Sequence, residues 1–105
     1  EMSVDQILRG MADTFVERGR QYGENYKYVG KALQNLFPNG LWLRSPEDFN
    51  RFATFSLMMV KMSRYAVNFE AGGHQDSVHD LAVYAAILEH LDAELKELTT
   101  LPGPI

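Results

Sequence analysis

Apolar residues recur at helical spacing near the start of the chain. Ser3 and Gln6 have the spacing of a capping box, which predicts that a helix over residues 3–18 begins here. Its apolar stripe consists of Ile7, Leu8, Met11 and Phe15. The segment 18–25 holds two glycines four residues apart, which are poor helix formers, so we expect a break there.

Three further helices are predicted downstream. One covers residues 26–36 and stops at the turn sequence Phe37-Pro38-Asn39-Gly40. A long one begins with Ser45 as N-cap and Pro46 at the first helical position, and ends near Glu70. After the glycine-rich segment 71–75, a fourth helix opens at Asp76 or Ser77.

These elements predict an all-α fold. No segment alternates with period two, no repeat occurs, and no low-complexity linker divides the 105 residues. We therefore expect one domain, residues 1–105, built like a four-helix bundle with two long C-terminal helices and a flexible tail over residues 99–105.

Composition narrows the function classes. The formal charge of −4 argues against a protein that mainly neutralises nucleic-acid phosphates, so a nucleic-acid partner is not expected. The chain has no cysteine, hence no disulfide, thiolate zinc site or cysteine nucleophile. Without a ~20-residue apolar run or a signal-peptide pattern, we expect a cytoplasmic protein with no membrane partner.

Two polar stripes interrupt the apolar faces of the last two predicted helices. Asp76, Asp80 and Tyr84 stand four residues apart, where the two carboxylates suit either a Mg²⁺ site or structural roles. In the structural reading, Asp76 is an N-cap and Asp80 pairs with a base on the neighbouring helix. Lys61 and Arg64 are the bases at hand, and they either neutralise the aspartates or hold a phosphate in a pocket.

The glycine-containing segment 18–28 carries a second set of candidates. Arg18 and Arg20 supply charge, and Tyr22 and Tyr26 supply flat faces on which a nucleotide base could stack. An ordinary loop with tyrosines packed at its rim is the competing reading. His74 could reach a ligand from the loop before Asp76, but the three histidines form no metal-binding motif, so neither a metal nor a cofactor is expected.

Three motifs in this chain resemble a family of small phage and prophage proteins. The family pattern combines R-x-x-x-Y-G, K-x-x-R and H-x-D-S-x-x-D-x-x-x-Y; here these are Arg18 to Gly23 with one shift in the arginine, Lys61 to Arg64, and His74 to Tyr84. The resemblance spans most of the chain. It implies a phage accessory protein acting in the host cytoplasm.

The last two predicted helices also resemble the core of MazG-type all-α nucleoside triphosphate pyrophosphohydrolases. That family places E-x-x-E on one helix and E-x-x-D on the next; Asp80 matches the final aspartate, and Asp76 is displaced by one position. Lys61 and Arg64 stand where the two glutamates should be. Two cations in place of two metal ligands disfavour Mg²⁺ but could hold a phosphate directly.

We therefore expect a non-enzymatic, homo-oligomeric protein that binds a nucleotide or another phosphorylated small molecule. In a phage, such a protein would sequester a host defence signalling nucleotide. One alternative is a divergent Mg²⁺-dependent pyrophosphohydrolase that uses Asp76, Asp80, Glu17 and Glu24. A second is a protein inhibitor of a host enzyme, whose charged stripes are only structural.

Overall fold

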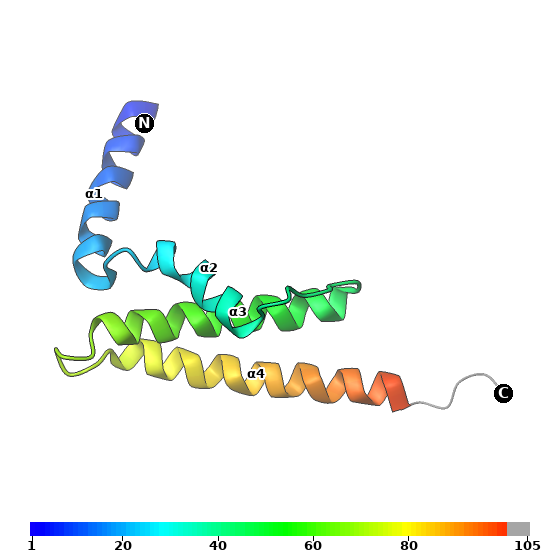
Figure 1. Cartoon of the computed structure of the whole chain (residues 1–105). Coiled ribbons are helices and arrows are strands. Elements are labelled where there is room, and N and C mark those ends of the chain that lie inside the picture. Colours follow the sequence, from blue (N-terminus) through cyan, green and yellow to red (C-terminus); the bar gives the residue numbers. More distant parts are fainter. Residues whose placement is uncertain (101–105) are drawn as a thin grey trace.

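The computed structural model describes residues 1–100, with side chains through Leu98, and this part of the chain is helical (Figure 1). The elements are α1 (Val4–Tyr22), α2 (Asn25–Leu36), α3 (Pro46–Val67) and α4 (Gln75–Thr100). No strand occurs among the described residues, so the all-α prediction is confirmed there. None of these helices is both long and apolar enough to cross a membrane.

The centre of the molecule is the antiparallel pair formed by α3 and α4 (Figure 1). Two ion pairs join these helices along their length. The Arg51 Nε atom lies 2.6 Å from Asp92 Oδ1, and the Lys61 Nζ atom lies 2.9 Å from Asp80 Oδ2. The turn between the helices requires Gly73, whose φ is +95° and where a Cβ would approach the Tyr65 ring to 3.0 Å.

Helix α2 packs on α3 through aromatic rings. Phe37 lies just after α2. Its ring centroid is 5.3 Å from that of Phe55 and 6.4 Å from that of Phe52, and both contacts are edge-to-face. At the other end of α2, Asn25 Nδ2 donates to Ser63 Oγ over 3.2 Å. α3 therefore holds α2 as well as α4.

Helix α1 projects away from the other three helices (Figure 1). It ends where Gly23 takes a φ of +62°, and Asn68 Nδ2 donates to the Gln21 carbonyl to hold this end against α3. Every residue from 1 to 21 is exposed. The expected four-helix bundle is thus not formed within one chain, because α3 already carries α2 and α4 and offers α1 a contact only near its C-terminal end.

Local start signals were predicted well. Gln6 Oε1 accepts from the Ser3 N–H over 2.9 Å, which confirms the capping box of α1. Ser45 Oγ accepts from the Asp48 N–H over 3.2 Å and Pro46 is the first residue of α3, both as predicted.

Three boundaries differ from expectation. α1 runs four residues further than residue 18, since Gly19 stays helical and only Gly23 turns the chain. α3 stops at Val67 rather than near residue 70. α4 extends to Thr100, so residues 99 and 100 belong to the helix and not to the predicted tail, and residues 101–105 lie outside the described part.

The prediction that Asp76 caps α4 is wrong. The helix begins one residue earlier, at Gln75, and the Nδ1 atom of His74 accepts from the Ser77 N–H over 3.3 Å. Ser77 is 1% exposed, and its hydroxyl oxygen lies 2.6 Å from the same nitrogen. The imidazole takes the place that a capping carboxylate would have, and Asp76 lies exposed in the first turn.

We predict that Ser45→Ala lowers the free energy of unfolding by about 1 kcal/mol, because it removes the side-chain acceptor for an N–H at the start of α3. Urea denaturation followed by circular dichroism measures the change. Asn50→Ala, at an exposed position one turn later, is the control and should change the stability much less. Equal effects of the two substitutions would contradict the capping role.

Candidate functional site

The Tyr22 ring joins three parts of the fold at the end of α1. The Arg64 guanidinium of α3 stacks on this ring with its carbon 4.5 Å from the centroid. The edge contact with the His74 imidazole, which precedes α4, has a centroid distance of 5.7 Å and an interplanar angle of 90°. Three residues predicted from separate motifs therefore meet at one place.

A cleft of about 160 Å³ opens beside Arg64, where the end of α1 and the start of α2 face α3. We call it the Tyr22 cleft. Its lining consists of Phe15, Arg18, Gly19, Tyr22, Gly23, Asn25, Tyr26 and Arg64. Two arginines and two tyrosines thus line the cleft, and no carboxylate does.

Arg64 is the residue of the cleft with an unmet hydrogen-bonding need. Its Nε atom is buried and has no hydrogen-bond partner among the described residues. A buried donor left unsatisfied costs about 1–3 kcal/mol, and more when the group is charged. Because this atom is closed off from solvent, a ligand in the cleft would engage the terminal nitrogens of the guanidinium instead.

Lys61 lies one turn before Arg64 on α3, and it pairs with Asp80 of α4 instead of lining the cleft. The Lys61 side chain is only 15% exposed, whereas that of Asp80 is 42% exposed. The hydrogen bond from the Lys61 ammonium is the main cause that lowers the pKa of Asp80 below its ordinary value, with smaller contributions from the charges of Lys61, His79 and Arg64. The structure thus places Asp80 as the counter-charge of Lys61.

The remaining predicted residues lie outside the Tyr22 cleft. The Arg20 guanidinium pairs with Glu17 on the solvent side of α1, 3.4 Å away. Asp76 is exposed, and Tyr84 is half-buried one helical turn beyond Asp80. None of these three lines the cleft. His74 contacts it only through the Tyr22 ring.

Phe15 and Asn25 line the cleft and were not among the predicted site residues. Phe15 precedes Arg18 by three residues and Tyr22 by seven, which puts all three on one face of α1. That spacing could have revealed the connection, but the break expected within residues 18–25 concealed it. Asn25 carries no sequence signal, since its position depends on its hydrogen bond to Ser63.

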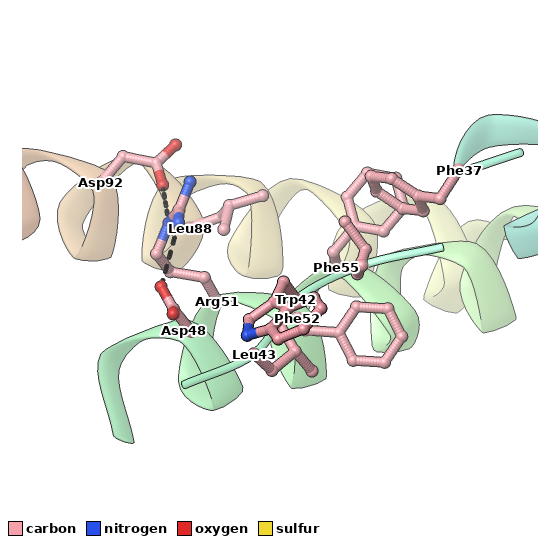
Figure 2. Close-up of a pocket in the computed structure, with 10 residues that line it drawn as sticks. Phe37, Trp42, Leu43, Asp48, Arg51, Phe52, Phe55, Leu88 and Asp92 are labelled. Atoms are coloured by element: carbon pink, nitrogen blue, oxygen red, sulfur yellow. Dashed lines mark hydrogen bonds and ion pairs between the residues drawn. The ribbon is translucent and has the colours of Figure 1, made fainter. Parts of the chain in front are cut away.

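A larger hollow of about 320 Å³ lies at the other end of the α3–α4 pair (Figure 2). Its walls are mostly apolar, with Trp42, Phe52 and Leu88 among them. Its single cation, Arg51, lies between Asp92 at 2.6 Å and Asp48 at 3.8 Å (Figure 2). Because two carboxylates already engage this guanidinium, the larger hollow offers no free positive charge to a phosphate.

No group of three or more His, Asp or Glu side chains that could hold a metal ion occurs in the part of the chain that the structure describes. Comparison with protein-family models, with curated proteins and with solved structures gave no match. The chemistry of the site therefore has to be argued from its own geometry. A small cleft with two guanidinium groups, aromatic walls and no acid is suited to an anion that carries a flat group.

We predict that Asp80→Asn destabilises the protein at neutral pH but not in strong acid. A carboxyl whose pKa is lowered by folding contributes stability above its unfolded-state pKa and loses it as the pH falls through the folded-state value. The stability gap between wild type and variant should therefore close as the pH drops below 3.8. Urea denaturation across the acidic range measures it.

Asp13→Asn, an isosteric change on the exposed face of α1, is the control for this experiment. A gap between wild type and Asp80→Asn that stays constant across the whole range would show that the ion pair to Lys61 does not contribute to stability.

Proposed function

We propose that this protein binds a nucleotide or another phosphorylated small molecule in the Tyr22 cleft, without hydrolysing it, and does so as a homo-oligomer. The observation that carries the proposal is the Arg64 guanidinium, which lines a cleft free of carboxylates and forms no ion pair among the described residues. A phosphate oxygen is the acceptor that such a group binds most strongly.

Two arginines would share the phosphate. Arg64 is oriented by its stack on Tyr22, so little side-chain entropy is lost when it binds an anion. Arg18 is exposed on the other wall and adds a second positive charge. A phosphate between them would relieve their mutual repulsion.

Tyr26 is the aromatic surface for a base or another flat group. One face of the Tyr22 ring is already covered by Arg64, whereas Tyr26 is 60% exposed at the rim of the cleft. Stacking of a base on an aromatic side chain contributes about 1–3 kcal/mol. In this proposal Lys61 does not touch the phosphate, since its charge is taken up by Asp80.

The biological use that we propose comes from the resemblance to phage proteins. A phage protein that binds a nucleotide and leaves it intact would sequester a signalling nucleotide of the host's defence, in the host cytoplasm. The rival enzyme reading needs Asp76, Asp80, Glu17 and Glu24 to hold Mg²⁺ together. Glu17 and Asp80 are each paired with a cation in the structure, and Asp76 lies exposed in the first turn of α4.

We predict that Arg64→Met weakens binding of a phosphorylated ligand 10- to 100-fold, the loss expected for charge-assisted hydrogen bonds of about 1.5–3 kcal/mol. ATP, ADP and cyclic dinucleotides are tested by calorimetry and thermal shift, with and without Mg²⁺. A ligand present at 100 times its Kd should stabilise the wild type by ~2.7 kcal/mol. Arg20→Met, which removes a guanidinium outside the cleft, is the matched control and should bind like the wild type.

Each rival reading has its own outcome in this experiment. Hydrolysis of a nucleotide that requires Mg²⁺ and disappears in Asp80→Ala would replace the binding proposal by the enzyme. If no ligand stabilises the wild type while a host protein is recovered in pull-down, the inhibitor reading replaces it. If Arg64→Met and the wild type bind the ligand with equal affinity, the ligand does not bind in the Tyr22 cleft.

A further inference from the structure

Helix α1 presents a continuous apolar stripe to solvent. Its members, with their exposed fractions, are Val4 (73%), Ile7 (41%), Leu8 (59%), Met11 (60%) and Phe15 (61%). The spacing of four and three residues between Val4, Leu8, Met11 and Phe15 is that of a helix–helix seam. The same face of α1 continues through Arg18 to Tyr22, so the stripe leads directly into the Tyr22 cleft.

The chain as a whole leaves too much surface uncovered for a stable monomer. Its accessible surface is 8489 Å², and a folded monomer of 11.9 kDa is expected to expose about 6,000 Å². The radius of gyration of 18.5 Å compares with about 13 Å for a compact domain of this length. Among the described side chains no apolar residue is buried; the buried residues are Thr54 and Ser77, which are 9% and 1% exposed.

The excess is spread over the whole chain and is large enough to include an interface between subunits. About 2,500 Å² of surplus surface per chain is at the upper end of what each subunit of an obligate homodimer buries, about 1,000–2,500 Å². Most of the stability of a helix in a protein comes from packing of its amphipathic face, so α1 needs a partner that is present whenever the chain is folded. A second copy of the chain meets that requirement.

The charges of α1 favour a protein partner over a membrane surface. Helices that lie on membranes are rich in lysine and arginine on the polar face. α1 has three acidic and three basic residues, and therefore no net positive charge; they are Asp5, Asp13, Glu17, Arg9, Arg18 and Arg20. The positions that flank the seam carry only Asp5, so a second copy meets little like-charge repulsion there.

We infer that a second copy of this chain packs along the apolar stripe of α1 and that the resulting dimer closes the Tyr22 cleft. The cleft of one chain holds about 160 Å³, whereas sites for small organic ligands span about 300–1,000 Å³. Phe15 belongs to both the stripe and the cleft lining, so a copy seated on the stripe lies next to the cleft and adds the missing wall. The closing of the cleft rests on the proposed function; the dimer does not.

The wild-type protein tests the dimer first. Analytical ultracentrifugation at micromolar concentration should give twice the chain mass of 11.9 kDa. Hydrogen exchange should show α1 amides as protected as those of α3, because a helix without a packed face frays readily. A monomeric wild type, or α1 amides that exchange like an unfolded segment, would overturn the inference.

Variants then locate the interface. Leu8→Glu combined with Met11→Glu places two charges on the stripe without touching the cleft lining, and is expected to shift the mass toward the monomer. Val16→Glu is the matched control, since Val16 is an equally exposed apolar residue roughly 120° away around the same helix, and it should stay dimeric. Should the double variant unfold instead, the mass and exchange of the wild type and the control still decide the question.

Ligand binding separates this inference from the proposed function. With ADP as the probe, a monomeric Leu8→Glu/Met11→Glu protein should bind at least tenfold more weakly than the wild type. Equal affinity would show that the second copy adds nothing to the cleft. A wild type that is dimeric and binds no phosphorylated ligand would contradict the proposed function and leave the interface on α1 intact.

Discussion

An amphipathic helix in a protein is stabilised mainly by burial of its apolar face, and α1 finds no such burial within its own chain. The rest of the structure follows from this. α3 packs against α2, where the Phe37 ring contacts Phe52 and Phe55, and against α4, to which two ion pairs join it. Only the C-terminal end of α1 is held, by Tyr22 and by the hydrogen bond from Asn68 to Gln21. The cleft forms at the point where α1 leaves the other helices.

Pairing of charges decides which cations remain for a ligand. Lys61 pairs with Asp80 at 2.9 Å and Arg51 pairs with Asp92 at 2.6 Å, and both aspartates belong to α4. Arg64, one turn later on α3, stacks on the Tyr22 ring, lines the Tyr22 cleft and forms no ion pair among the described residues. A K-x-x-R motif that looks like one cationic unit in the sequence is therefore divided between a structural ion pair and a candidate ligand contact.

The fold class and most helix starts could be predicted because their signals are local. Ser45 with Pro46, and Ser3 with Gln6, act within one turn of helix, so no distant residue can change their meaning. Asp76 was assigned wrongly because a histidine two residues earlier accepts the same kind of N–H and starts the helix sooner. The site was predicted residue by residue, as Tyr22, Arg64 and the rest, but not which of them meet.

The sequence by itself determined four helices, their apolar stripes, and which arginines and tyrosines were candidates for a site. Only the tertiary structure decided that Arg64 rather than Lys61 lines the cleft, that Phe15 belongs to it, and that α1 stands apart from the α3–α4 pair. The physical reason is the distance along the sequence over which each interaction acts. Periodicity and capping are set by neighbours along the chain, whereas ion pairing and burial depend on which surface a helix reaches, and that choice is made among residues far apart in sequence.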